Sequence, residues 1–228
     1  EVGAEPHAIR KAYRKMAMKY HPDKNPQGRD MFEKVQQAYE LLCATRQEVA
    51  EGGPDRVAIL LMVRTQCILF TRHRETLSVY KYAGYPLLLS VMDVAPDAVV
   101  TGERAELMEA SARLVYLTCL ASPRNAEELL RENGVRVLCK LLFMVKSGVH
   151  VQTAPGDTSV KVIENILHTL SGMSTLAAGR AALRECATFG PDLVACLELM
   201  QCHKTVQFAL ECAGRSAVDA DMQNWLVD

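Results

Sequence analysis

The chain has little net charge and few aromatic residues. Its 26 Lys and Arg residues nearly balance 27 Asp and Glu residues, the formal net charge is −1, and 6% of the residues are aromatic. A chain without an excess of one sign has no overall field that would draw it to nucleic acid or to an anionic membrane. Any charge signal in this protein must therefore be local.

The sequence also lacks a long apolar run. Its most apolar stretch, residues 57–70, contains Arg64 and is shorter than the roughly 18 unbroken apolar residues that a transmembrane helix needs. We therefore predict no membrane-spanning helix. The chain opens at Glu1-Val2-Gly3, without an initiator methionine or a basic-then-apolar leader, which indicates a piece of a longer protein.

Paired cysteines are absent as well. No Cys-x-x-Cys motif occurs among the eight cysteines, which are Cys43, Cys67, Cys119, Cys139, Cys186, Cys196, Cys202 and Cys212. Cysteines scattered among apolar residues are typical of reduced core thiols in a cytosolic protein. Cys196, Cys202 and His203 lie close together, but they do not have the paired spacing of zinc ligands, so we predict no metal site.

The motifs of enzymes are missing too. We find no nucleophile with an adjacent base and no phosphate-binding loop. The sequence therefore predicts no catalytic residues, no cofactor and no enzymatic activity.

Residues 6–20 have the periodicity of an amphipathic helix. One face carries apolar residues at the i, i+3, i+4, i+7 spacing, namely Ile9, Ala12, Tyr13, Met16, Ala17 and Tyr20. The other face carries cations four residues apart, namely Arg10 and Arg14, and Lys11, Lys15 and Lys19. Pro6 suits the first helical turn, and Pro22 disfavours helix at His21, so the helix should end near Tyr20.

A second helix is predicted at about residues 30–48. Its apolar face holds Phe32, Val35, Tyr39 and Leu42. Two helices with facing apolar stripes form an antiparallel hairpin. The connecting loop, residues 21–28, contains two prolines and a glycine and is expected to be a stiff, exposed turn.

The stretch AIRKAYRKMAMKYHPDKNPQGRDMFEKVQQAYELL resembles helices two and three of the DnaJ family, with His-Pro-Asp at the top of the hairpin. The resemblance implies that this segment docks on a DnaK-class heat-shock chaperone and stimulates its ATPase. The residues that it implies for chaperone binding are Arg10, Tyr13, Arg14, Lys15, His21, Pro22, Asp23 and Asn25. A basic helix face alone is usually only solvated, but here His-Pro-Asp follows it directly.

The resemblance departs from the family at one point. A complete J domain has a first helix that packs across the hairpin, whereas few residues precede Pro6 in this chain. We therefore expect a J domain over residues 1–50 that lacks its first helix and leaves part of the apolar stripe exposed. A two-helix hairpin of this size is marginally stable by itself.

Residues 55–228 form the second predicted domain, which follows the boundary Glu51-Gly52-Gly53-Pro54. We predict helices at about 55–73, 84–94, 104–121, 124–132, 134–147, 157–178, 179–187, 190–203 and 204–217. Gly84, Gly134 and Gly190 each separate a short helix from a Leu-rich one, which predicts an armadillo/HEAT-like α-solenoid with a concave face. An irregular all-α domain is the alternative.

Three segments of the sequence resemble the receptor-mediated endocytosis protein eight family of large endosomal DnaJ homologs of subfamily C. They are NPQGRDMFEKVQQAYELL, which is part of the stretch above, TQCILFTRHRETLSVYKYAGYPLLL and NAEELLRENGVRVLCKLL. This resemblance implies a co-chaperone on the cytoplasmic face of early endosomes, associated peripherally through other parts of the parent protein. There the heat-shock cognate ATPase would remove clathrin or sorting-nexin coats in retromer-linked sorting. The alternative function is a helical-repeat scaffold with a degenerate J domain.

Overall fold

The computed structural model describes residues 6–20, 25, 28, 31–36, 56–94 and 102–218. The chain divides into two compact units, Glu1–Asp55 and Arg56–Asp228. Every regular element within the described residues is a helix, so the prediction of an all-α fold is confirmed. Among these residues, no helix is both long enough and apolar enough to cross a bilayer.

The first unit contains helix α1, Pro6–Tyr20, and a helical segment at residues 31–36. α1 begins at a proline, whose missing N–H costs nothing in the first helical turn, and it ends at Tyr20 as predicted. The second predicted helix, at about 30–48, is described only over residues 31–36. The rest of that prediction lies outside the described residues.

The second unit is a succession of short and long helices. Their bounds are α3 (Arg56–Arg72), α4 (Arg74–Leu77), α5 (Tyr85–Met92), α6 (Gly102–Ala121), α7 (Pro123–Arg131), α8 (Gly134–Lys146), α9 (Thr158–Met173), α10 (Ala177–Arg184), α11 (Phe189–Leu197) and α12 (His203–Ser216). All nine helices predicted for this region occur. Most of their ends shift by no more than a few residues.

Three details of the prediction are wrong. The four-residue helix α4 was not predicted; it buries no side chain and therefore shows no apolar periodicity. α9 ends at Met173 instead of continuing to 178, because the backbone then forms a turn in which the N–H groups of Thr175 and Leu176 donate to carbonyls three residues back, at 3.2 and 2.9 Å. α11 ends at Leu197 instead of 203, since a turn follows it in which Cys202 donates its N–H to a carbonyl at 2.8 Å.

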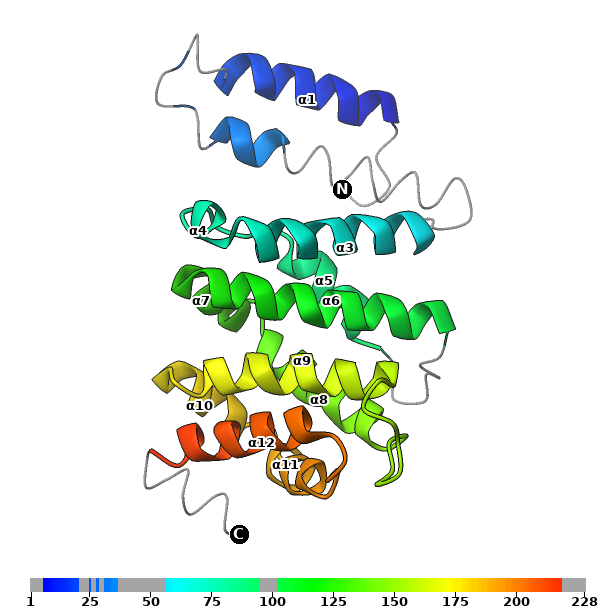
Figure 1. Cartoon of the computed structure of the whole chain (residues 1–228). Coiled ribbons are helices and arrows are strands. Elements are labelled where there is room, and N and C mark those ends of the chain that lie inside the picture. The colour runs from blue at the N-terminus through cyan, green and yellow to red at the C-terminus, as the bar shows by residue number, and fades with distance from the viewer. Residues whose placement is uncertain are drawn as a thin grey trace. The chain divides into compact units, whose positions relative to one another are not determined.

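The four long helices of this unit lie side by side. α3 packs on α6, α6 on α9, and α9 on α12, and Figure 1 shows them crossing the unit in succession. Two shorter helices separate each long helix from the next: α4 and α5, then α7 and α8, then α10 and α11. The same three-helix order thus occurs three times, which makes the unit a helical repeat.

The three glycines that indicated the repeat mark the start of the second of the two shorter helices in each copy. Gly84 precedes α5, Gly134 is the first residue of α8, and Gly190 lies in the first turn of α11. A Cβ at Gly84 would lie 2.5 Å from the Tyr82 hydroxyl oxygen, and one at Gly134 would collide with Leu129. At Gly134 the helices α7 and α8 therefore approach too closely for a side chain, whereas at Gly84 a side chain would displace the ring of Tyr82.

The core of the unit is continuous from Val63 in α3 to Cys212 in α12 and consists mainly of aliphatic side chains. The seven described cysteines are free, and five of them are buried, as predicted for core thiols. Burial raises the pKa of Cys196 and Cys212 to about 12, so both stay protonated at neutral pH. Cys43 lies outside the described residues.

Gly179 and Gly172 test how closely α10 packs against the end of α9. A Cβ at Gly179 would collide with the backbone carbonyl of Met173, whereas one at Gly172 would meet nothing within 4 Å. We expect Gly179→Ala to lower the free energy of unfolding by about 1–3 kcal/mol, because backbone must move. Gly172→Ala should raise it by up to about 1 kcal/mol through helix propensity. Urea denaturation measures both, and equal effects would contradict this close approach.

Candidate functional site

The exposed side of α1 is basic. The side chains of Lys11, Arg14, Lys15 and Lys19 are all exposed. Arg14 and Lys15 make no ion pair within the part of the chain that the structure describes. Lysines four residues apart form one row along the helix, with Arg14 beside it. This row is therefore available to an acidic surface, which it would attract and orient through long-range charge.

The other side of α1 faces the second helical segment. Tyr13, Ala17 and Tyr20 are half-buried, as are Phe32 and Val35 across the hairpin. This agrees with the predicted apolar faces. However, Met16 is 36% exposed and Met31 is 41% exposed, so part of the apolar surface of the described hairpin remains open to solvent.

Two residues beyond the end of α1, Asn25 and Gly28, are described and contact each other. The N–H of Gly28 donates to the Asn25 carbonyl at 2.9 Å, and the N–H of Phe32 donates to the Gly28 carbonyl at 2.8 Å. Gly28 is buried, and a Cβ there would lie 2.9 Å from the Tyr20 carbonyl oxygen and 3.1 Å from the Asn25 amide. Gly28 therefore lies close against both the last turn of α1 and the Asn25 side chain.

The structure places part of the predicted chaperone-binding set. Arg14 and Lys15 lie on the exposed side of α1, and Tyr13 lies half-buried next to them. Asn25 lies in the loop beyond the end of this helix. His21, Pro22, Asp23 and the side chain of Arg10 lie outside the described residues, so their roles stay predictions.

Gly28 is a site residue that the sequence reasoning missed. The sequence predicts it only as a turn former, whereas in the structure a side chain at this position would collide with the Tyr20 carbonyl. The feature of the sequence that could have indicated this role is the position of Gly28 just before the second helix. A close approach of two backbones at such a position often requires glycine.

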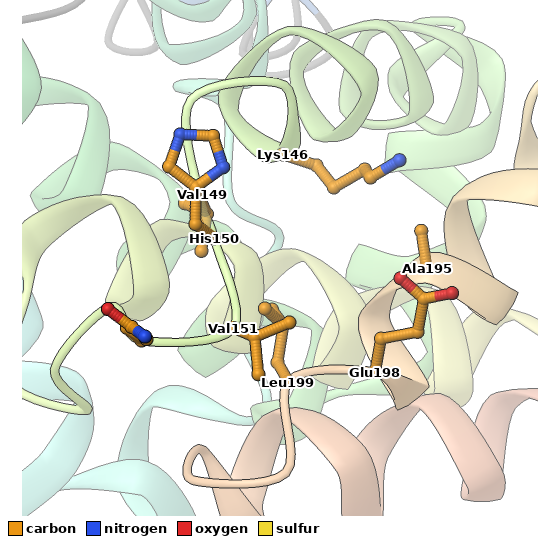
Figure 2. A pocket seen from close by; sticks show the side chains of 8 residues that line it. Lys146, Val149, His150, Val151, Ala195, Glu198 and Leu199 are labelled. Atoms are coloured by element: carbon orange, nitrogen blue, oxygen red, sulfur yellow. The ribbon is translucent and has the colours of Figure 1, made fainter.

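A separate pocket in the second unit lies between the loop after α8 and the end of α11 (Figure 2). Its volume is about 560 Å³. The residues that line it are Lys146, Val149, His150, Val151, Gln152, Ala195, Glu198 and Leu199. These residues include no serine, threonine or cysteine that His150 could activate as a nucleophile. The pocket thus offers charged side chains of both signs but no catalytic pair of that type.

Metal ligands do not gather in the described residues. Nowhere among them do three His, Cys, Asp or Glu side chains come together as a metal ion would require. Cys196 and Cys202 are buried, and burial raises the pKa of both thiols, which opposes the thiolate form that binds metals.

Comparison with known proteins identifies the N-terminal segment. Residues 1–49 match the DnaJ domain family. Over 60 residues the chain is 59% identical to DnaJ homolog subfamily A member 4 of Homo sapiens, a match that covers 22% of this chain and 15% of that protein. Over 43 residues it is 54% identical to chaperone protein DnaJ of Clostridioides difficile, covering 18% of this chain and 11% of that protein.

One relative matches along both units. The chain is 38% identical over 221 residues to DnaJ homolog subfamily C GRV2 of Arabidopsis thaliana, and the match covers 96% of this chain. The chain spans only 9% of the length of that protein. No solved structure matches the chain.

Proposed function

Because residues 1–49 carry a DnaJ domain, we propose that the chain is a co-chaperone, not an enzyme, and that it stimulates the ATPase of a DnaK-class chaperone. The observation that carries the proposal is the exposed row of cations on α1, which ends directly before His21-Pro22-Asp23. The row would dock on the acidic ATPase domain, and the tripeptide would act at the junction between that domain and its linker. ATP hydrolysis itself would take place in the partner.

The loop suits this role physically. Proline at position 22 is expected to restrict the backbone next to His21, and Gly28 lies close to Asn25 and to the end of α1. A loop that proline restricts in this way loses less conformational entropy on binding. Asp23 could then pair with a cation of the chaperone without a large ordering cost.

A more specific proposal concerns where in the cell the protein acts and what it acts on. We propose that the protein acts in the cytoplasm on the surface of early endosomes and helps to remove clathrin or sorting-nexin coats during retromer-linked sorting. The support is the resemblance to the receptor-mediated endocytosis protein eight family and the long match to a subfamily C DnaJ homolog. The three-helix repeats of the second unit, which we assign to the armadillo type, would be the scaffold that brings the hairpin to its client.

A scaffold with a degenerate J domain is the second candidate. It is favoured by the size of the repeat unit, which has its own continuous core, and by the apolar surface that the hairpin leaves open at Met16 and Met31. Measurement of ATP hydrolysis by a DnaK-class chaperone, with and without the chain, separates the two. Stimulation supports the co-chaperone, and its absence supports the scaffold.

Reversal of charge on α1 tests the docking surface. We expect Arg14→Glu with Lys15→Glu to weaken binding to the chaperone by about tenfold or more, because two attractive charges become repulsive. Binding of the unchanged chain should also weaken with added salt, since exposed charges are screened beyond about 8–10 Å. Surface plasmon resonance at two salt concentrations measures both effects.

The matched control reverses two exposed arginines of the second unit, Arg124→Glu and Arg136→Glu. This control alters the net charge equally but leaves α1 unchanged, so binding should stay within about twofold. Equal losses for the two double variants, or an affinity that does not depend on salt, would contradict the assignment of the basic side of α1.

A further inference from the structure

The long helices of the second unit present a connected polar and aromatic surface. On α6, Glu109, Arg113 and Tyr116 are four and then three residues apart and so share one side of the helix. The amide of Asn165 on α9 donates to the Glu109 carboxylate at 3.5 Å. These residues thus link α6 and α9 across one face of the unit, where Figure 1 shows the two helices side by side.

An aromatic stack continues the same surface. The rings of Tyr116 on α6 and His168 on α9 are stacked with their centroids 4.0 Å apart, and His168 stacks on Phe208 of α12 at 4.0 Å. All three side chains are half-buried. The stack joins one long helix from each of three successive repeats, so its outer edge is a fixed, partly apolar ridge beside Arg113.

A pocket of about 340 Å³ opens between α3 and α6 and includes Glu109 and Arg113, which share one side of α6 with Tyr116. The residues that line it are Arg64, Cys67, Ile68, Thr71, Arg72, Glu109, Ala110 and Arg113. Arg64 is paired with Glu106 at 2.8 Å. Arg72 and Arg113 are exposed and have no ion pair within the described residues. Two unpaired guanidinium groups therefore border the same pocket.

The side chains around the pocket indicate which class of ligand it would bind. An arginine fork binds a carboxylate through two parallel hydrogen bonds. Glu109 in the same pocket would repel a dense polyanion such as nucleic acid, but its carboxylate can accept a backbone N–H. Ile68, which is 51% exposed, adds an apolar contact on the α3 side. A peptide supplies carboxylates, N–H groups and apolar side chains together, whereas a free phosphate supplies only charge.

We propose that this pocket and the neighbouring edge of the Tyr116 ring form a groove, and that the groove binds an acidic peptide segment of a partner protein. Side-chain carboxylates of the peptide pair with Arg72 and Arg113, and a backbone N–H donates to Glu109. The apolar side chains of the peptide lie on Ile68 and along the edge of the Tyr116 ring. The site lies wholly within the second unit, so it does not depend on the J-domain activity proposed above.

Selection of peptides tests the proposal without knowledge of the partner. The probe is a phage-displayed library of random twelve-residue peptides, selected on the immobilised full chain and on two variants of it. The groove variant carries Arg72→Gln and Arg113→Gln. The matched control carries Arg124→Gln and Arg136→Gln, which remove two exposed arginines elsewhere on the same unit. Circular dichroism checks that all three chains are folded.

We expect the unchanged chain and the control to enrich peptides with several Asp and Glu residues between apolar residues. The groove variant should lose this enrichment, and a selected peptide synthesised with a fluorescent label should bind it at least about tenfold more weakly, because two charge-assisted pairs are removed. Selection without acidic residues, or equal affinity for the groove variant and the control, would overturn the proposal. The ATPase assay tests the hairpin and not this site. A failure to stimulate the chaperone would therefore not affect the conclusion about peptide binding.

Discussion

Replacement of His21 by glutamine is expected to abolish stimulation of the partner ATPase and to leave the chain folded. His21 directly follows the last residue of α1 and precedes a proline, a position typical of an exposed turn, where a side chain contributes little to packing. Under the proposed function, this histidine belongs to the tripeptide that acts on the chaperone. Single-turnover ATP hydrolysis by a purified heat-shock cognate chaperone should therefore fall to its basal rate.

The controls separate a lost contact from a lost fold. His73→Gln changes an exposed histidine of the second unit and should retain full stimulation. The circular dichroism spectrum and the unfolding midpoint of the His21→Gln variant should match those of the unchanged chain. If the variant stimulates as well as the unchanged chain, the proposed mechanism is wrong. If neither chain stimulates, the scaffold function is favoured.

The helices of the second unit could be predicted from the sequence because each signal was local. Gly134 lies at the junction of two helices, where a side chain would collide with Leu129. Pro123 begins α7, at the position in a helix where proline is favoured. The repeated spacing of such junctions then indicated the repeat. The end of α9 could not be predicted, because residues 174–176 contain no glycine or proline that would indicate the turn.

The surfaces of the molecule were less predictable than its helices. The cations of α1 form a row that the helical period alone defines, so their common side could be predicted. By contrast, Tyr116, His168 and Phe208 lie in three different repeats, and only the register in which α6, α9 and α12 pack brings their rings to 4.0 Å. Periodicity along one helix carries no information on that register, so neither the stack nor the pocket beside Arg113 was predicted.

Amide hydrogen exchange is expected to show that the first unit opens far more readily than the second. The described apolar side chains of the hairpin are at best half-buried, whereas Leu114 in α6 and Ile163 in α9 are wholly buried. Full burial of one large apolar side chain contributes about 1.5–3 kcal/mol. A deficit of about 3 kcal/mol, from several partly covered side chains, corresponds to roughly 100-fold faster exchange. Mass spectrometry of peptides from residues 11–36 and 104–173 measures the difference.

A core substitution in the second unit tests whether the two units open independently. Leu114→Ala should destabilise that unit by about 2–5 kcal/mol and accelerate exchange in α6 and α9, because Leu114 is fully buried in the core that these helices share. If the units are independent, exchange at residues 11–20 and 31–36 should not change. Uniform protection along the unchanged chain, or acceleration of both units by Leu114→Ala, would mean that the hairpin gains its stability from the repeats and that the chain unfolds as one cooperative domain.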